Sequence, residues 1–423
     1  MKRRTFLKSV GTISAVTILK PDLVFGYKRN SAVQVGIIGC GNRGTAVITS
    51  MSTHTNTNII AMADLFADKL QTARPKFNQL NTGKSFAEIK ESNIYQGSKA
   101  YQQLINNKEV DAVLISSPAY THPPFLEAAV AGGKHVYCEK PVAPDTAGVR
   151  RVMAVGEKLP AKQSLVIGFQ IRYATPYVQM VQRIQEGAIG DIINVQLYYF
   201  SSGHAIREFP NVSDDEFRIR NQYHFNALSG GILLDQGIHM LDVCNWGLKS
   251  HALSAIGTGG TKGGPAQGDA WNNFQVLYQY PNDIKVSIHS TQIGPSFGDV
   301  CCRFIGTKGM AEAHYSGGVF IVGENPWDSG IARSQQELTP AQQAAGVFLS
   351  SLHDADANKE LAFIKSIETG NHLNEAKQGA ESTLTAILGR EAAAAGKKMT
   401  WDEVLLVNKR LDPKLNLAQF DPK

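Results

Sequence analysis

A glycine-rich loop near the start of the chain limits the possible folds more than any other feature. Residues 33–38 (VQVGII) are apolar and mostly β-branched, and Gly39-Cys40-Gly41-Asn42-Arg43-Gly44 follows them directly. A G-x-G-x-x-G loop between a strand and a helix allows a tight turn, a close approach of the backbone to a pyrophosphate, and close packing of helix on strand. The pattern predicts the first strand, turn and helix of a dinucleotide-binding domain.

An acidic residue stands where such a domain binds the adenosine ribose. Asp64 ends a second buried segment, residues 58–63, and follows Gly44 by twenty positions. A carboxylate at this place accepts hydrogen bonds from the ribose hydroxyls and repels a 2′-phosphate. We therefore expect NAD rather than NADP as the cofactor. The alternative is that Asp64 only caps the helix that follows.

Further apolar segments alternate with helical stretches. Residues 110–115, 135–138 and 164–169 are strand-like, and residues 122–131 are helical in pattern. This alternation predicts a parallel sheet, whose ligands bind beyond the carboxyl ends of the strands. Residues 78–97 are polar and are predicted to form a surface excursion. The residues that follow the strand ends, and are therefore expected cofactor contacts, are Ser117, Pro118, His122, Glu139, Lys140 and Gln170.

The N-terminal segment has the pattern of an export signal. Arg3-Arg4-Thr5-Phe6-Leu7-Lys8 is a twin-arginine motif, and an uncharged stretch from Ser9 to Leu19 follows it. That stretch is shorter than the ~20 residues that span a bilayer. We predict no membrane span, and a twin-arginine signal over residues 1–30 that directs the folded protein to the periplasm. An amphipathic or disordered N-terminus is the alternative.

Charge and cysteine content argue against other classes of protein. The formal net charge of +5 comes mostly from residues before position 26, so the body of the chain lacks the basic surface that nucleic-acid binding requires. Cys40, Cys138, Cys244, Cys301 and Cys302 show no C-x-x-C spacing. We expect these cysteines to be structural packing residues, and we expect no metal site.

Four motifs together indicate a family. They are the Gly39–Gly44 loop, Ser117-Pro118 followed by His122, Glu139-Lys140-Pro141, and residues 230–242 (GGILLDQGIHMLD). The last resembles a G-G-x-x-x-D-x-G-x-H helix. The set resembles the Gfo/Idh/MocA oxidoreductases, named for glucose–fructose oxidoreductase and inositol dehydrogenase, over roughly residues 33–390. Segments 213–221 and 228–246 are most similar to an exported branch of the family, which implies sugars or glycosides as substrates.

The resemblance also implies the fold. We expect an α/β Rossmann domain with a doubly wound parallel sheet over residues 31–172. Residues 173–423 are expected to form an α+β domain with a large, mostly antiparallel open sheet, often used for oligomerisation, so we expect a homo-oligomer. The sequence supports this expectation with strand-like segments at 192–200, 274–280, 284–291 and 300–306, a turn at 281–283, and a helical stretch over 358–395 interrupted near Gly370.

The second half of the chain supplies candidates for acid–base chemistry. Oxidising a carbinol requires an acceptor for the hydride and a base for the hydroxyl proton. On a helix, Asp235 and His239 would lie one turn apart on the same face, and histidine titrates near neutral pH. The resemblance implies that Lys140 and His239 are catalytic and that Asp235 assists them or holds the sugar. A structural interior histidine and a surface i,i+4 pair are the alternatives.

A polar and aromatic set of side chains is suited to binding a carbohydrate. Aromatic rings pack on the apolar faces of sugars, and charged or amide groups bind the hydroxyls. The predicted substrate-binding residues are Lys140, Tyr173, Arg220, Tyr223, Asp235 and His239.

Three functions remain open. The leading hypothesis is an NAD-dependent dehydrogenase that oxidises a hydroxyl of a sugar or glycoside, with the 3-hydroxyl suggested by the branch resemblance. The second is an NAD-dependent glycosidase that oxidises its substrate transiently, eliminates the leaving group, adds water and reduces the ketone again. It would need a further base, which the stretch from His204 to His224 could supply. The third is a non-catalytic sugar-binding protein.

Overall fold

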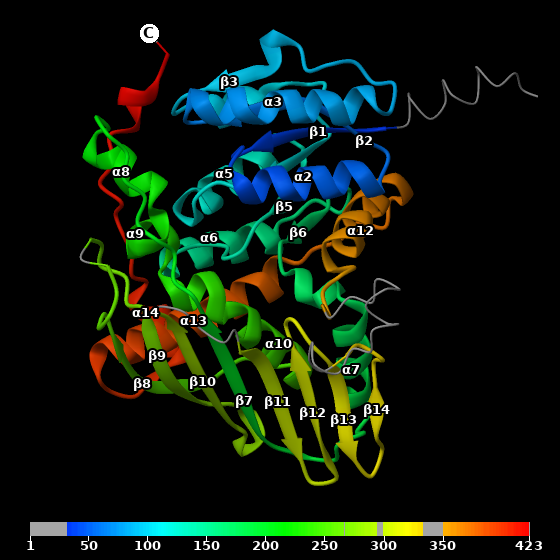
Figure 1. The fold of residues 1–423 in the computed structure, drawn as a ribbon, viewed down its shortest axis with the longest axis vertical. Helices are drawn as coiled ribbons and strands as arrows, with labels where there is room; N and C mark the ends of the chain where they lie inside the picture. Colours follow the sequence, from blue (N-terminus) through cyan, green and yellow to red (C-terminus); the bar gives the residue numbers. More distant parts are fainter. Residues whose placement is uncertain (1–31, 266, 294–298, 333–349, 423) are drawn as a thin grey trace, which may run out of the picture. The chain divides into compact units, whose positions relative to one another are not determined.

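A computed structural model describes residues 32–265, 267–293, 299–332 and 350–422. The predicted twin-arginine signal lies outside these residues. From Val33 onward the chain forms one unit that contains two sheets with a shared core (Figure 1).

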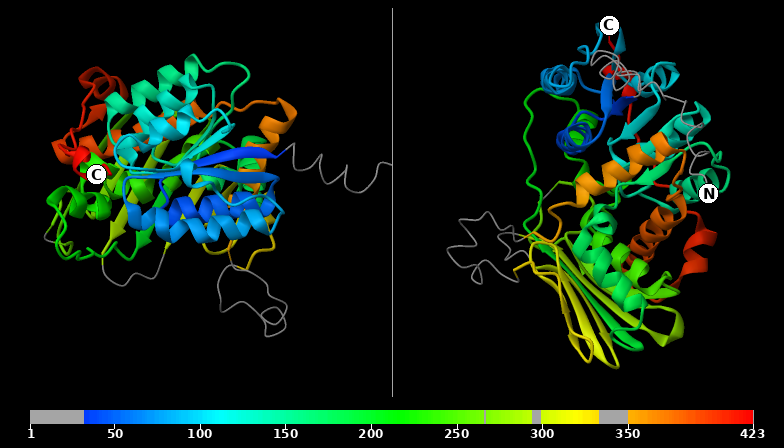
Figure 2. Two further views of the ribbon diagram at one scale, coloured as in Figure 1. Left: turned by 90° about the horizontal axis from the view of Figure 1, so that it is seen from above. Right: turned by 90° about the vertical axis from the view of Figure 1, so that its right-hand side faces the viewer.

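The first sheet has six parallel strands in the order β3-β2-β1-β4-β5-β6, which confirms the predicted doubly wound Rossmann topology. Its strands are β1 (Val33–Ile38), β2 (Thr57–Asp64), β3 (Ile94–Gln96), β4 (Ala112–Ile115), β5 (His135–Cys138) and β6 (Leu165–Ile167). Its helices are α2 (Asn42–His54), α3 (Ala67–Thr82), α4 (Ala100–Asn106), α5 (His122–Ala131) and α6 (Thr146–Glu157). Helices lie on both faces of the sheet (Figure 2, left).

One part of the sequence prediction for this sheet was wrong. Residues 78–97 are not only a surface excursion, because α3 extends to Thr82 and β3 forms an edge of the sheet beside β2. The strand is only three residues long and half-buried along its length. Such a strand carries too little apolar periodicity to be recognised, and its place is determined by pairing with β2.

The second sheet has nine strands in the order β14-β13-β12-β11-β7-β10-β9-β8-β15. Among the described strands, neighbours are antiparallel except for β7 and β10, which confirms the expected mostly antiparallel sheet. The strands are β7 (Ile192–Ser201), β8 (Ser254–Gly260), β9 (Asn273–Gln279), β10 (Lys285–Gln292), β11 (Val300–Gly306), β12 (Gly309–His314), β13 (Val319–Gly323), β14 (Trp327–Asp328) and β15 (Met399–Thr400).

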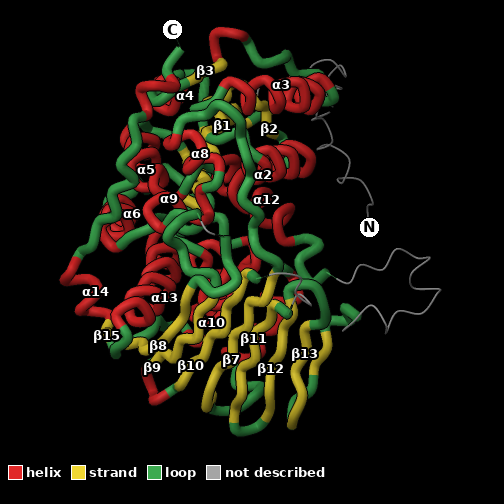
Figure 3. The backbone as a smooth tube through the Cα atoms, turned by 60° about the vertical axis from the view of Figure 1, so that its left-hand side comes forward, coloured by secondary structure: helices red, strands yellow, loops and turns green. Residues whose placement is uncertain are grey.

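Helices cover one face of this second sheet (Figure 3). Helix α13 packs on β8 and β9, α10 packs on β7 and β11, and α7 packs on β12 and β13. The helices of this half are α7 (Thr175–Gln185), α8 (Asp214–Arg220), α9 (Asn226–Ser229), α10 (Ile238–Leu248), α12 (Ala355–Thr369), α13 (Ala376–Ala395) and α14 (Trp401–Val407). None of the described helices is long and apolar enough to cross a bilayer.

Helix α12 comes late in the chain but packs on a helix of the first sheet. It belongs to the part of the chain assigned to the second domain, but it packs on α2, and Phe363 and Ile364 join the core on that face of the first sheet. The chain therefore returns to the nucleotide-binding half after building the second sheet. The return places Asp356 and Lys359 beside the glycine-rich loop.

This packing also buries a carboxyl group. Glu360 of α12 is fully buried, and neither of its carboxylate oxygens has a hydrogen-bond partner among the described residues. Burial raises the pKa of Glu360 from its ordinary 4.5 to about 8. Because the folded state binds this proton more tightly than the unfolded state, the contribution of Glu360 to stability is lost as the pH rises from about 4.5 to about 8.

We therefore expect Glu360→Gln to raise the melting temperature more at pH 8 than at pH 5, because the amide carries no charge at either pH. Thermal unfolding of both proteins at the two pH values measures the difference. Glu368→Gln, on the exposed part of the same helix, is the matched control and should change neither value. A gain that is equal at both pH values would contradict the buried carboxylate.

Candidate active site

A cavity of about 370 Å³ lies beyond the carboxyl ends of β1, β2 and β4. The glycine-rich loop, residues 64–66 and residues 116–118 form one side of it, and residues from 204 to 224 form the other. The sequence-predicted residues that line the cavity are Gly39, Gly41, Asn42, Arg43, Asp64, Ser117, Pro118, Arg220 and Tyr223. Polar residues from the two halves of the chain therefore meet where a parallel sheet binds its ligand.

The glycine-rich loop fits a pyrophosphate. Gly39 has a φ of +95°, and a side chain there would lie 2.6 Å from the backbone of Ser116. A side chain on Gly44 would lie 2.1 Å from the carbonyl oxygen of Gly39. Gly41 has open space beside it, and as the N-cap of α2 it leaves the first amides of that helix without a side-chain cap. The first and third glycines thus permit close packing, and the second exposes the helix N-terminus to a phosphate.

Asp64 is held by the backbone of the same loop. Its Oδ2 accepts a 2.7 Å hydrogen bond from the amide of Cys40, and its Oδ1 accepts one of 3.0 Å from Phe66. Burial raises the pKa of the Asp64 carboxyl. Its carboxylate reaches the cavity, where ribose hydroxyls can donate to it. Cys40 does not line the cavity: its thiol lies 3.9 Å from the carbonyl oxygen of Ala63, as a packing residue does.

His122 connects two loops of the site. Its Nδ1 lies 2.7 Å from the carbonyl oxygen of Pro141, and its Nε2 lies 2.8 Å from that of Ser117. The ring is buried, and burial lowers its pKa. The sequence predicted a cofactor contact here. In the structure His122 does not line the cavity and joins the loop after β4 to the loop that carries Lys140, and the cofactor contact stays a prediction.

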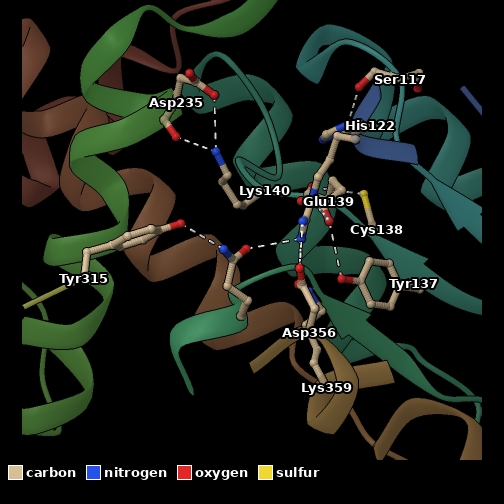
Figure 4. A network of polar contacts seen from close by, with 12 residues as sticks. Ser117, His122, Tyr137, Cys138, Glu139, Lys140, Asp235, Tyr315, Asp356 and Lys359 are labelled. Atoms are coloured by element: carbon tan, nitrogen blue, oxygen red, sulfur yellow. Dashed lines mark hydrogen bonds and ion pairs between the residues drawn. The ribbon is translucent and has the colours of Figure 1, made fainter. Parts of the chain in front are cut away.

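Arg43, which lines the cavity, also organises a polar network whose members Glu139, Asp356 and Tyr315 are labelled in Figure 4. Its guanidinium bonds to Glu139 at 3.0 Å, to Asp356 at 3.0 Å and to Gln170 at 3.2 Å. Gln170 in turn donates to the hydroxyl of Tyr315 at 3.0 Å. Neither Glu139 nor Gln170 lines the cavity, and their predicted contacts with the cofactor stay predictions. Both residues bond to Arg43 and orient it. They do so because a buried carboxylate such as Glu139 needs a charged partner.

Lys140 and Asp235 meet across the two halves of the chain (Figure 4). The ammonium group lies 3.2 Å from Asp235 Oδ1 and also donates to the backbone carbonyl of Asp235. On the other side, Asp235 Oδ2 lies 3.4 Å from Nε2 of His204. Burial alone would raise the pKa of Asp235, but Lys140 and His204 hold it below its ordinary value. Asp235 is therefore a carboxylate held between two nitrogen groups.

Asp235 does not lie on a regular α-helix. Residues Leu233–Gly237 form a π-helical turn, and α10 begins directly after it at Ile238. The sequence predicted a regular helix with Asp235 and His239 one turn apart. The wider turn changes which side chains and carbonyl groups face the site, and π-turns inside helices are frequent at functional sites. The close pair that the structure forms is Asp235 with Lys140.

His239 is a buried, neutral imidazole. It is 6% exposed, and its Nδ1 has no hydrogen-bond partner among the described residues. The rings of Tyr199 and Tyr315 lie 6.4 Å and 6.2 Å from it. Burial, and then the charge of Lys140, hold the pKa of His239 well below its ordinary value. A histidine in this state is able to accept a proton at neutral pH.

Lys140, Asp235 and His239 lie next to the nucleotide cavity but do not line it. The connection is His204, which lines the cavity, bonds to Asp235, and stacks on Tyr223 with the two rings 4.2 Å apart. The sequence placed His204 in a stretch suited to sugar contacts or to supplying a further base, without linking it to Asp235. Its pairing with Asp235 joins residues 31 positions apart and left no local signal in the sequence.

Tyr173 is not brought to this site. Its hydroxyl donates a 2.5 Å hydrogen bond to Glu375, beside the start of α13. Burial raises the pKa of Glu375, whose other oxygen accepts from the amide of Ile167. Tyr173 therefore pairs with the carboxyl group of Glu375, and the prediction that it binds substrate stays a prediction.

Arg220 lies at the far end of the cavity, beside the segment that follows β2. It bonds to Asp68 at 2.8 Å and to Glu216 at 2.7 Å, and its guanidinium lies 4.1 Å from the ring of Phe66. The predicted substrate contact is therefore placed at the Asp64 end of the cavity, away from Lys140. The pairing with Asp68 orients it there.

The C-terminal segment closes the same end of the cavity. Leu417 lines it, and the ring of Phe420 packs edge-on against Phe66 at 5.2 Å. Asp421 accepts a 2.6 Å hydrogen bond from the amide of Ser98. Sequence reasoning found no role for these residues, because each contact joins the last residues of the chain to the first sheet. Segments from three parts of the chain thus enclose the place expected for the adenosine.

The fold and the site define an oxidoreductase with a nucleotide-binding Rossmann domain. The model of the oxidoreductase family with an NAD-binding Rossmann fold, GFO_IDH_MocA, matches residues 33–166, and the model of the GFO/IDH/MocA C-terminal domain matches residues 177–312. Together they cover more than half of the chain. The chain belongs to the Gfo/Idh/MocA family, and its cofactor is NAD.

Related proteins agree with this assignment. Inositol 2-dehydrogenase from Rhizobium meliloti is 24% identical over 340 residues, which are 80% of this chain and 89% of that protein. Inositol 2-dehydrogenase from Pseudomonas fluorescens is 26% identical over 284 residues, 66% and 74% of the two chains.

Two solved structures share the fold. Aldose–aldose oxidoreductase from Caulobacter crescentus, complexed with glycerol, has a TM-score of 0.67 at 19% identity and covers 87% of this chain and 99% of its own. Scyllo-inositol dehydrogenase from Lactobacillus casei, with bound NAD(H) and scyllo-inositol, has a TM-score of 0.64 at 21% identity and covers 88% and 99%.

Proposed function

We propose that this protein is a dehydrogenase that oxidises a ring hydroxyl of a sugar, cyclic polyol or glycoside. The observation that carries the proposal is the arrangement of Lys140, Asp235 and the neutral His239 beside a cavity that fits a dinucleotide. The relatives named inositol 2-dehydrogenase support a polyhydroxylated ring as substrate. The resemblance to the branch that acts on glycosides favours the 3-hydroxyl.

Each catalytic residue has a task that follows from its environment. When bound, NAD supplies the acceptor for the hydride. The ammonium group of Lys140 donates a hydrogen bond to the reacting oxygen and stabilises negative charge that develops there. An imidazole nitrogen of His239 accepts the hydroxyl proton, because burial and Lys140 keep the ring neutral. Asp235 holds Lys140 in place and offers a carboxylate to a neighbouring hydroxyl.

His204 acts on the reaction through Asp235. It lies on the cavity side of the carboxylate, and its side chain is 37% exposed. Removing the contact at Oδ2 leaves Asp235 free to turn away from Lys140. We expect His204→Gln to lower kcat about 10- to 100-fold, the range that corresponds to one hydrogen bond to a charged group.

Steady-state kinetics across pH measures this effect. A positioning role predicts that kcat falls more than KM rises and that the acidic limb of the pH profile shifts. The exposed His353→Gln is the matched control and should leave both parameters unchanged. An unchanged kcat in His204→Gln would remove His204 from the mechanism.

One observation favours a second candidate, the NAD-dependent glycosidase. Elimination of a leaving group needs a base beside the carbon next to the ketone, and the His204–Tyr223 stack lies close to Asp235. Asp235, and then burial, raise the pKa of the Tyr223 hydroxyl, so Tyr223 stays protonated at neutral pH. Its stacking partner His204 is the residue that this candidate would use as the base.

A single titration distinguishes the candidates. The protein with its bound nucleotide is mixed with a panel of polyols, free sugars and glycosides, while the absorbance of reduced nicotinamide and the release of free sugar are recorded. A rise in absorbance without cleavage supports the dehydrogenase. Release of sugar from a glycoside without net reduction supports the glycosidase. If the protein binds no nucleotide and shows no spectral change, the non-catalytic sugar-binding protein is the candidate that remains.

Two sequence predictions also stand as proposals. The twin-arginine motif supports export to the periplasm, and fractionation of cells that express the full chain tests it against a variant with Arg3 and Arg4 changed to lysine.

The open second sheet supports self-association, and sedimentation of the purified protein tests it.

A further inference from the structure

A second cluster of reactive side chains lies on β11 and β12, apart from the catalytic residues. Asp299 directly precedes β11, Cys301 lies in that strand, and His314 ends β12. Asp299 and Cys301 are two positions apart and so point to the same face of the sheet. Cys301 and His314 are direct partners in the antiparallel register. Three residues of three chemical types therefore converge from one hairpin.

The donor atoms are close enough to share an ion. The carboxylate oxygen, the thiol sulfur and the imidazole nitrogen all lie within 4.8 Å of one another. Asp299 Oδ1 and His314 Nδ1 are 3.9 Å apart. This distance is too long for a hydrogen bond. It is, however, within the reach of one cation bonded to both atoms, because zinc bonds to nitrogen and oxygen at about 2.0–2.2 Å and to sulfur at about 2.3 Å.

The opposite edge of the imidazole is already engaged. Nε2 of His314 lies 2.6 Å from Glu312, and Glu312 accepts a 2.6 Å hydrogen bond from Arg303. A neutral imidazole whose Nε2 donates to a carboxylate presents the lone pair of Nδ1 to its other side. Metal-binding histidines typically carry such a carboxylate partner on the second nitrogen, which orients the ring. Nδ1 of His314, the ring nitrogen on the side of Asp299, is available as a ligand in the tautomer that keeps the proton on Nε2.

Burial and exposure also suit a metal centre. Cys301 is fully buried, so its thiolate would be shielded from oxidation. His314 and Asp299 are 29% and 24% exposed, which leaves a path by which an ion can enter. A mixed set of sulfur, nitrogen and oxygen ligands favours zinc over magnesium or calcium, which take oxygen alone.

We propose that Asp299, Cys301 and His314 form a zinc site with a fourth position open to water. The site lies on the face of the sheet opposite the tyrosine that packs beside His239. Tyr198 is the register partner of Cys301, and its neighbour Tyr199 packs beside His239 on the opposite face of β7. His314 is followed by Tyr315, the second ring beside His239. Zinc therefore holds together the strand ends that carry both tyrosines.

The full chain is stripped with a chelator, dialysed and tested with zinc and cobalt. We expect about one zinc ion retained per chain, and Co²⁺ should produce a thiolate charge-transfer band typical of a tetrahedral site. Cys301→Ser should abolish that band, and His314→Gln should lower zinc affinity at least tenfold. Asp299→Asn, at a partly exposed position, provides a variant that is expected to fold like the wild type.

His289→Gln is the matched control. His289 lies on β10, which pairs with β7, and stacks on Tyr198. It is not one of the proposed ligands, so the zinc content of the His289→Gln variant should equal that of the wild type. Circular dichroism establishes that each variant is folded. If the wild type retains no zinc and gives no cobalt band, or if folded Asp299→Asn and His314→Gln bind as tightly as the wild type, the proposal is overturned.

Discussion

Lys140→Met should lower kcat about 10²- to 10⁴-fold and leave NAD bound. Methionine keeps the length of the side chain, but it cannot donate a hydrogen bond to the reacting oxygen, and groups of this kind contribute about that factor to catalysis. Lys140 does not line the nucleotide cavity, so the binding of the dinucleotide should change little. Reduction of the nicotinamide in single-turnover experiments measures the chemical step, and nucleotide released on denaturation measures binding.

His239→Ala should reduce turnover in the same way, because it removes the neutral base.

Lys285→Met, on an exposed strand position of β10, is the control for the loss of a lysine and should behave as the wild type does. If Lys140→Met retained more than about a tenth of wild-type kcat, the catalytic role of Lys140 would be wrong. If it lost NAD altogether, its role would be structural.

Asp242→Ala should cost about 3–5 kcal/mol of the free energy of unfolding, the range found when one partner of a buried ion pair is removed. Arg172 bonds to Asp242 through Nε at 2.9 Å and Nη2 at 2.8 Å, and Ser382 donates to the same carboxylate at 2.7 Å. Asp242 is 1% exposed. Its removal leaves the guanidinium of Arg172, whose side chain is 12% exposed, without its ion-pair partner, beside the loop of Tyr173 and the helix that carries His239.

Denaturant titration of both proteins measures this loss. The double variant Arg172→Leu with Asp242→Leu should recover part of the stability, because it removes both charges together. Glu109→Ala breaks an exposed pair with Lys90, whose atoms lie 3.5 Å apart, and should have little effect. A loss in Asp242→Ala no larger than in Glu109→Ala would contradict the buried ion pair.

Local sequence patterns predicted several elements with their bounds. Helix α5 (His122–Ala131) and the strands β5 (His135–Cys138) and β11 (Val300–Gly306) begin and end as the spacing of apolar residues indicated. The glycine-rich loop and Asp64 were also placed, because their geometry depends on residues next to them in the chain. Strand β8 (SAIGTGG) was missed, since its glycines hide the strand pattern, and β14 and β15 are only two residues long.

In the candidate site, too, local patterns predicted some features and missed others. The motifs identified Lys140, Asp235 and His239 as chemically important. They could not show that Lys140 bonds to the carbonyl of Asp235 within a π-turn, or that His204 lies on the other side of Asp235. For Glu139 and Gln170 the predicted contact was with the cofactor, whereas the structure pairs both with Arg43. A motif shows which residue types are present, but it does not determine which residues they contact.

The sequence alone determined the class of fold and the cofactor, because both depend on residues close together in the chain, and it named the candidate catalytic residues Lys140, Asp235 and His239. Tertiary structure decided which distant groups share a buried charge. Arg43 and Asp356 are 313 positions apart, and their pairing exists only because α12 returns to pack on α2. Cys301 and His314 face each other only in the register of β11 and β12. Such pairings follow from burial, because a buried polar group needs a partner within the protein. Local sequence patterns cannot predict which distant residue that partner is.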